Sequence, residues 1–215
     1  MTNGIPVRPG ENAVGVTDRK EKILREVPAG MRKTGLDILG VGCGAGIFGR
    51  RLAGEPGIRK VVALDPMTES AGPADERSGA AIEILRWKEK RFPFADETFD
   101  VSLSTSALPR IPVPSRFAFV SEIKRVTKRG GKIVFLEPNP WNPLTRFLYP
   151  DSRGSRRISP RELADLARRN GLKVLGTRYF VFMPRALERV LRADGFLKRC
   201  PLGIRYGVIT ERAGG

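Results

Sequence analysis

A glycine-rich turn with an acid downstream is the part of this sequence whose residue types and spacing best suit chemistry. The apolar run 36–41 leads directly into Gly42, Gly44 and Gly46. Glycines let a ligand approach the backbone, because a Cβ atom would block that approach. Asp65 follows the next apolar run, 21 residues after Gly44, where an acid can bind ribose hydroxyls. Together these features predict a nucleoside-binding crevice at the carboxyl ends of neighbouring strands.

The same turn also contains a match to a dinucleotide-binding pattern. Residues 44–49 satisfy G-x-G-x-x-G, which leaves an NAD(P)-dependent oxidoreductase open as an alternative. The first glycine of this pattern is Gly44, whereas the apolar run ends near Val41. In dinucleotide-binding proteins the first glycine follows the strand closely, so the position of this match is unusual. The sequence contains no Tyr-x-x-x-Lys pair, which would support the oxidoreductase.

The composition excludes several classes of enzyme. The 215-residue chain has no histidine and two cysteines, Cys43 and Cys200. Ser-His-Asp and Cys-His hydrolases and HExxH metalloproteases are therefore excluded, and we predict neither a disulfide framework nor a metal site. No run approaches the roughly 18 apolar residues of a membrane span. Residues 1–10 lack the apolar core of a secretory signal, so we expect a cytoplasmic protein.

Short apolar runs that alternate with helical patterns predict an α/β fold. The predicted strands are 36–41, 61–64, 82–87, 99–103, 133–136, 172–182 and 204–210. The predicted helices are 17–27, 47–53, 113–127, 159–170 and 184–197. Buried strands separated by helices are typical of a doubly wound, Rossmann-like and mostly parallel sheet, here with seven strands and an antiparallel last strand. Residues 1–16 are predicted to form a flexible arm, and residues 17–215 a single domain.

Two helix boundaries carry specific signals. Ser159 is followed by Pro160 and by Glu162, which predicts a capping box at the start of a helix. Gly130 and Gly131 are predicted to end the helix over 113–127, because glycine is common at helix C-termini. The second signal places the start of the next strand at about residue 133.

Three segments of the sequence carry a family resemblance. Residues 41–46 read VGCGAG, residues 92–101 read FPFADETFDV, and residues 121–133 read SEIKRVTKRGGKI. They resemble the glycine motif, the segment before the fourth strand and the helix-to-strand passage of class I S-adenosylmethionine-dependent methyltransferases, in particular the small ones with a type 11 domain. The resemblance covers residues 36–138, about half of the chain. It implies S-adenosyl-L-methionine as the cofactor and methyl transfer as the activity.

The resemblance also implies which residues hold the cofactor. Gly42, Gly44 and Gly46 would let the backbone pass the methionine part, Asp65 would hold the ribose hydroxyls, and residues 104–106 would face the methyl donor. The full implied set is Gly40, Val41, Gly42, Cys43, Gly44, Gly46, Asp65, Pro66, Met67, Lys88, Glu89, Ser104 and Thr105.

Three positions depart from the family's pattern. The acid of the glycine motif falls on Gly40, and the aspartate near the adenine amino group falls on Lys88, next to Glu89. The histidine pair that the family often has after its fourth strand reads Pro109-Arg110. Pro66 and Met67 match the positions that line one face of the adenine. The departures at Gly40 and Lys88 leave a non-catalytic binding module with the methyltransferase fold open as an alternative function.

The proline-rich segment 137–150 follows the fifth predicted strand, where strand ends face the crevice. Glu137 is the candidate for orienting or deprotonating the acceptor, and no other catalytic residue is predicted. We expect acceptor contacts from Asn139, Trp141, Asn142 and Tyr149. The alternative is a rigid connector in which Trp141 only fills space.

Positive charge suggests partners. Lys and Arg number 39 against 23 Asp and Glu, a net charge of +16. Residues 184–199 combine an apolar side with several cations, a pattern typical of a basic helix on an anionic membrane. The same cations could bind RNA phosphates or form a solvated surface. We expect a small or lipid-like acceptor and, as a partner, an anionic membrane surface in preference to RNA. The oligomeric state stays open.

Overall fold

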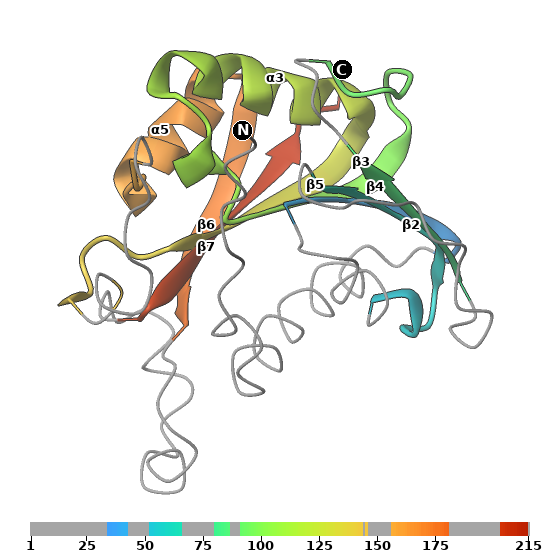
Figure 1. Cartoon of the computed structure of the whole chain (residues 1–215). Helices are drawn as coiled ribbons and strands as arrows, with labels where there is room; N and C mark the ends of the chain where they lie inside the picture. Colours follow the sequence, from blue (N-terminus) through green and yellow to red (C-terminus); the bar gives the residue numbers. More distant parts are fainter. Residues whose placement is uncertain are drawn as a thin grey trace, which may run out of the picture.

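The computed structural model describes residues 34–42, 52–65, 80–86, 91–143, 145, 156–180 and 203–214. Within them, seven strands form one sheet that carries helices α3 and α5 on one face (Figure 1). The strands are β1 (Leu36–Val41), β2 (Ile58–Asp65), β3 (Ala81–Arg86), β4 (Phe99–Thr105), β5 (Thr127–Pro138), β6 (Leu172–Phe180) and β7 (Arg205–Arg212). The helices are α3 (Arg116–Val126), α5 (Pro160–Arg169) and the short 3₁₀ turns η3 (Leu108–Arg110) and η4 (Val113–Ser115).

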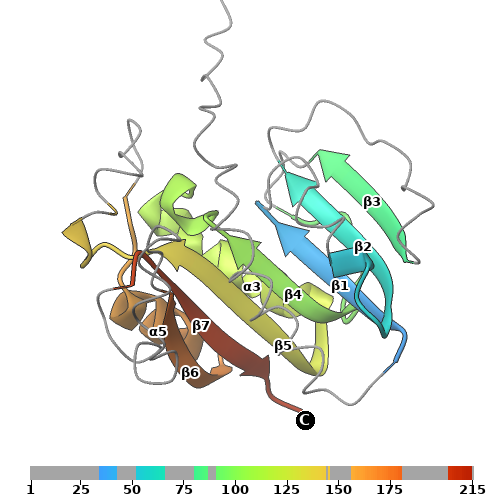
Figure 2. The ribbon, with the colours of Figure 1, turned by 90° about the horizontal axis from the view of Figure 1, so that it is seen from below.

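The strand order places a switch point beside β1. The order is β3-β2-β1-β4-β5-β7-β6, and the strands lie side by side in Figure 2. Strands β1 to β5 are parallel, whereas β7 is antiparallel to both β5 and β6. The chain runs outward from β1 to β3 and then returns to β4 on the other side of β1, which is where open α/β sheets bind ligands. The predicted doubly wound fold with an antiparallel last strand is confirmed.

Each face of the sheet buries its own apolar cluster. Val120 of α3 and Leu163 of α5 pack with Phe135 of β5 on the face that these helices cover. Leu52 packs with Val134 on the opposite face. Within the described residues, no helix is long and apolar enough to cross a membrane.

The helix before β5 ends earlier than the sequence predicted. Helix α3 ends at Val126, and the strand begins at once, so the two glycines at 130 and 131 do not end the helix. They lie instead where the pairing of β4 with β5 shifts register. A Cβ atom on Gly131 would meet the Asp100 carbonyl oxygen at 2.9 Å. The same Cβ atom would lie 2.7 Å from the Lys128 carbonyl oxygen and 2.7 Å from the Thr127 methyl carbon. Glycine is therefore required by contacts within its own strand as well as by close packing against β4.

The capping box at the start of α5 is confirmed. The Ser159 hydroxyl accepts the Glu162 backbone N–H at 3.2 Å, and the Glu162 carboxylate accepts the Ser159 N–H at 2.8 Å. These two bonds satisfy donors that a helix start leaves free. The predicted helices over 17–27 and 184–197, most of the one over 47–53 and the predicted arm over 1–16 lie outside the described residues.

Arg125 joins two of the segments on which the family resemblance rests. Its guanidinium donates to both Glu122 carboxylate oxygens at 2.9 Å, to the Phe92 and Phe94 carbonyls at 3.1 and 2.8 Å, and to Asp96 at 2.7 Å. Glu122 also accepts the Phe92 N–H at 3.0 Å. The hydrogen bond with Glu122 raises the pKa of Arg125 above its ordinary value. The segment before β4 is thereby fixed to the end of α3.

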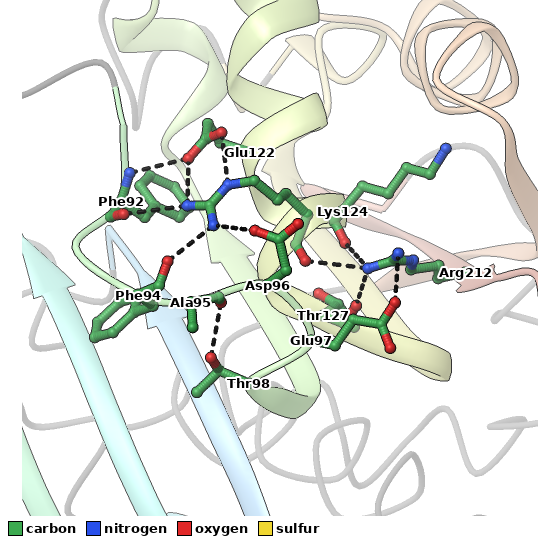
Figure 3. Close-up of polar contacts among 11 residues, drawn as sticks. Phe92, Phe94, Ala95, Asp96, Glu97, Thr98, Glu122, Lys124, Thr127 and Arg212 are labelled. Carbon is green, nitrogen blue, oxygen red and sulfur yellow. Dashed lines mark hydrogen bonds and ion pairs between the residues drawn. The ribbon is translucent and has the colours of Figure 1, made fainter.

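Arg212 holds the same corner from β7. Its guanidinium donates to the carbonyls of Lys124, Arg125 and Thr127 at 3.0, 3.0 and 2.6 Å, and to the Glu97 carboxylate at 2.9 Å. The Lys124 and Arg125 carbonyls belong to the last turn of α3, where helices leave acceptors without partners, and the Thr127 carbonyl belongs to the first residue of β5. A cation at the C-terminus of a helix also interacts favourably with the helix dipole. The last strand therefore stabilises the junction between α3 and β5 (Figure 3).

We expect Arg125→Ala to destabilise the protein by about 3 kcal/mol, because it leaves the largely buried Glu122 carboxylate without its cationic partner and the Phe94 carbonyl without its guanidinium donor. Urea unfolding at neutral pH measures this. The matched control is Arg168→Ala, whose ion pair with Asp165 is exposed and should contribute less than about 0.5 kcal/mol. Equal free energies of unfolding for the two variants would contradict the role of the Arg125 cluster.

Candidate active site

The glycine turn after β1 lies against the end of β4. Gly42 has a φ of +71°, and its N–H donates to the Leu64 carbonyl at 2.9 Å. A Cβ atom at this position would lie 2.8 Å from the Thr105 carbonyl oxygen and 3.2 Å from the Ala107 Cβ. No side chain fits without displacing the backbone of β4. The turn therefore brings bare backbone to the switch point.

The residues before Gly42 lie inside the sheet. Gly40 is paired with Ala63 of β2 and Leu103 of β4, and Val41 is paired with Leu64 and Ser104. Glycine thus stands in a fully buried position where the family's pattern has an acid. The carboxyl end of β1 itself therefore carries no acidic side chain.

Asp65 supplies an acid at the neighbouring strand end. It is the last residue of β2, it is 4% exposed, and it directly follows Leu64, whose carbonyl binds the Gly42 N–H. The predicted proximity of the glycine turn and this acid is thus present in the structure. The implied cofactor residues Cys43, Gly44, Gly46, Pro66, Met67, Lys88 and Glu89 lie outside the described residues.

Three consecutive hydroxyls at the end of β4 are buried without a hydrogen-bond partner among the described residues. They belong to Ser104, Thr105 and Ser106. Ser106 has a φ of +52°, and its N–H donates to the Leu136 carbonyl of β5 at 2.9 Å. Burying a hydroxyl without a partner is costly, so these groups are suited to a polar ligand at the strand ends. They lie at the same edge as Gly42 and Asp65.

Glu137 lies one strand further along, in β5, with its side chain fully buried. Its Oε1 accepts the Leu108 N–H at 3.3 Å, and its Oε2 has no hydrogen-bond partner among the described residues. Burial raises the pKa of Glu137 to about 8, although the Leu108 N–H and the charges of Arg205 and Arg116 favour the ionised form. The carboxyl group therefore fixes the turn after β4 and keeps one oxygen available.

The segment after β5 is tied to the start of β7. The Asn139 N–H donates to the Ile204 carbonyl at 2.8 Å, and its side-chain amide donates to the Gly203 carbonyl at 2.6 Å. Its side-chain oxygen accepts the Trp141 N–H at 3.1 Å, and the Asn142 side-chain oxygen accepts a backbone N–H at 3.3 Å. The fully buried Asn139 therefore ties the end of β5 to the residues before β7.

Trp141 is not a buried plug. Its side chain is 44% exposed, and the Arg161 guanidinium lies 5.9 Å from the ring centroid. The other predicted acceptor residue of this segment, Tyr149, lies outside the described residues. The Trp141 ring, one of the predicted acceptor contacts, is thus accessible to solvent at this edge of the sheet.

The sequence reasoning missed the partners of Glu137. Leu108, Arg116 and Arg205 come from a turn, a helix and the last strand, far apart along the chain. Arg205 is 2% exposed, which is unusual for arginine. No local pattern marks a buried arginine, because only the pairing of β7 with β5 brings it next to the end of β5.

Comparison with known proteins relates this region to a family. A family model described as a methyltransferase domain matches residues 39–135, a little under half of the chain. This region of the chain is similar to that family. The match spans β1 to β5 and includes Gly42, Asp65 and the three hydroxyls that follow Leu103, whereas Glu137 lies just beyond it. The expected resemblance is confirmed.

Two curated proteins show how the relationship extends. An uncharacterized methyltransferase of Mycobacterium leprae is 35% identical over 107 residues, which are 49% of this chain and 38% of that protein. A ubiquinone biosynthesis O-methyltransferase of Cereibacter sphaeroides is 28% identical over 180 residues, 74% of this chain and 69% of that protein. The chain thus covers about two fifths of the length of the mycobacterial relative.

A solved structure supports the fold over nearly the whole chain. An S-adenosylmethionine-dependent methyltransferase from Aquifex aeolicus superposes with a TM-score of 0.65 and 21% identity, covering 96% of this chain and 94% of that one. At this level of identity the likeness establishes the fold, and function has to be argued from the site.

Proposed function

We propose that this protein transfers a methyl group from S-adenosyl-L-methionine to a small or lipid-like acceptor. The observation that carries the proposal is the strand-end constellation of Gly42, Asp65 and the unpartnered hydroxyls of residues 104–106. It combines a bare backbone turn, an acid for a ribose and polar groups that lack partners. These features fit the nucleoside and amino-acid parts of the cofactor.

The chain's own groups would have separate tasks at this site. The turn at Gly42 would admit the methionine part, Asp65 would bind the ribose hydroxyls, and Ser104 and Thr105 would lie beside the methyl donor. When bound, the cofactor supplies a methyl group on a positively charged sulfur, which is a good leaving group. The protein therefore needs mainly to hold an acceptor in line and to exclude water.

Glu137 is proposed to position the acceptor side of the site. It fixes the turn after β4 through Leu108, and its second oxygen remains available to accept or donate a hydrogen bond. A weakly nucleophilic acceptor such as a hydroxyl would benefit from a group that takes its proton. The O-methyltransferase of Cereibacter sphaeroides is a relative whose name describes oxygen methylation, which supports a hydroxyl acceptor.

We expect Asp65→Asn to weaken binding of S-adenosylhomocysteine by roughly tenfold, since a hydrogen bond to a charged group contributes about 1.5–3 kcal/mol. Isothermal titration calorimetry measures the dissociation constant. Asp165→Asn is the control, because Asp165 is exposed on α5 and should leave binding unchanged. Identical affinity of Asp65→Asn and wild type would remove Asp65 from the donor site.

A second candidate function is a binding module that keeps the fold but not the donor site. Glycine at position 40, where the family's pattern has an acid, favours it, and Lys88 lies outside the described residues. The two candidates differ in whether the chain binds the methyl donor and transfers its methyl group. A folded chain that binds neither S-adenosylmethionine nor S-adenosylhomocysteine would support the module, and transfer of a labelled methyl group into an organic extract would support the enzyme.

A further inference from the structure

Exposed apolar side chains gather where the chain leaves β4. Of the four large hydrophobic residues that are strongly exposed in the described part of the chain, Val113 and Phe117 are 47% and 43% exposed. They lie four residues apart across the start of α3, so they share one side. The exposed neighbours Pro112, Pro114 and Ala118 extend this apolar surface. We call the segment 110–118 the β4–α3 surface.

The charged residues within the β4–α3 surface have one sign. No Asp or Glu occurs between residues 101 and 121. Arg110 is exposed within the segment, and the Arg169 guanidinium of α5 lies 5.8 Å from the centroid of the Phe117 ring. Among the described residues, no carboxylate forms an ion pair with Arg110 or Arg169. An apolar surface bordered by such cations is complementary to an anionic, partly apolar partner.

A second exposed aromatic residue lies at the same edge of the sheet. Trp141 follows the carboxyl end of β5, the strand next to β4, and is 44% exposed beneath the Arg161 guanidinium. A second arginine–aromatic pair, Arg161 with Trp141, therefore lies next to the end of β5. The unpartnered hydroxyls of residues 104–106 lie at this edge too. The surface and the donor site thus share one end of the molecule.

We propose that the β4–α3 surface, assisted by Trp141, docks on the headgroup region of an anionic phospholipid bilayer. Val113 and Phe117 would enter the interface, and Arg110, Arg161 and Arg169 would contact lipid phosphates. Docking in this orientation presents the carboxyl edge of the sheet to the bilayer. This inference rests on the proposed function and narrows the acceptor to a lipid-dissolved molecule taken from the membrane surface.

A bilayer fits these observations better than a nucleic acid. Aliphatic and proline side chains cannot stack with bases in the way RNA-binding surfaces require. Val113 and its proline neighbours instead gain free energy on leaving water, as in interfacial membrane binding. Tryptophan and arginine are also suited to the interface, because both combine an apolar part with a polar end.

Vesicle flotation of the full chain tests the proposal. The wild type should float with vesicles of phosphatidylcholine plus phosphatidylglycerol and remain behind with phosphatidylcholine alone. We expect Val113→Ser/Phe117→Ser to lower the partition coefficient roughly tenfold or more, because burial of these side chains stabilises the bound state by more than about 1.4 kcal/mol. Arg110→Gln/Arg169→Gln should weaken binding and reduce its salt dependence.

Matched controls lie at other places on the chain. Leu175 is the fourth exposed hydrophobic residue, at 46%, and lies within β6, so Leu175→Ser should float like the wild type. Arg129→Gln/Lys173→Gln removes two charges from the starts of β5 and β6, the opposite edge, and should have less effect than the Arg110/Arg169 pair.

Three outcomes would overturn the proposal. The first is failure of the wild type to float with phosphatidylglycerol vesicles, and the second is flotation of Val113→Ser/Phe117→Ser equal to that of the wild type. The third is that the wild type binds single-stranded RNA and not vesicles, and that the same variants lose this RNA binding. S-adenosylhomocysteine binding without vesicles is measured on every variant. Unchanged binding there would show that the donor site persists even if the membrane proposal fails.

Discussion

Glu137→Gln is expected to remove a large pH dependence of stability. The pKa of Glu137 is raised from its ordinary 4.5 to about 8 by burial. Below about pH 4.5 this carboxyl is protonated in both the folded and the unfolded chain. As the pH rises from 4.5 to about 8, the unfolded chain ionises while the folded chain keeps the proton. The free energy of unfolding should therefore fall over this window.

The size of the effect follows from the shift of the pKa. Each pKa unit corresponds to about 1.4 kcal/mol, so the loss should be on the order of 4 kcal/mol between pH 5 and pH 8.5. Glutamine keeps an acceptor oxygen for the Leu108 N–H but cannot ionise. Since the chain has no histidine, few other groups titrate in this window. Urea unfolding at five pH values measures the difference between variant and wild type.

Glu162→Gln is the control for this series. Glu162 lies in the capping box of α5, and hydrogen bonding by Ser159 lowers its pKa. Its contribution to stability is therefore lost only as the pH falls below its ordinary value of 4.5. This variant should retain the wild-type loss at neutral and alkaline pH. A wild type whose stability is flat or rising from pH 5 to pH 8.5 would contradict the burial of Glu137.

Gly42→Ala is expected to lower strongly the affinity of the protein for the methyl donor. The new Cβ atom would lie 2.8 Å from the Thr105 carbonyl oxygen, so the end of β1 or of β4 has to move. Displacements of this kind at a binding site reduce function by about a hundredfold, and we expect that loss in the affinity for S-adenosylhomocysteine. Isothermal titration calorimetry measures it.

Gly35→Ala separates this close approach from backbone strain. Gly35 has a φ of +74°, close to the +71° of Gly42, but a Cβ atom there would meet nothing within 4 Å. Both variants incur the cost of a left-handed alanine, about 1–2 kcal/mol. Only Gly42→Ala should lose donor binding. Equal losses in the two variants would mean that general destabilisation, and not the contact with β4, explains the effect.

The fold and the donor edge were largely predictable from sequence. The apolar runs around 36–41 and 61–64 mark buried strands, and glycine and aspartate directly after them place Gly42 and Asp65 at strand ends. The capping box at Ser159 was predictable for the same reason, because all its partners lie within four residues. Local patterns are informative when the interacting groups are close along the chain.

Tertiary contacts explain what the sequence could not reveal. Gly131 is required by the Lys128 carbonyl of its own strand and by the Asp100 carbonyl of β4, about thirty residues away, so its appearance as a helix end was misleading. Arg125 links Glu122 with Asp96, so the segments 92–101 and 121–133 contact each other although they are about thirty residues apart. The surroundings of Glu137 arise only when β7 pairs with β5.

Titration of S-adenosylhomocysteine into the purified full chain, followed by calorimetry, tests the central claim most directly. NADH and NADPH are titrated in parallel. We predict one-to-one binding of S-adenosylhomocysteine, loss of that binding in Gly42→Ala, and no binding of either nicotinamide nucleotide. Binding of a nicotinamide nucleotide, or a folded chain that binds none of the three ligands, would contradict the assignment of a methyl-donor site.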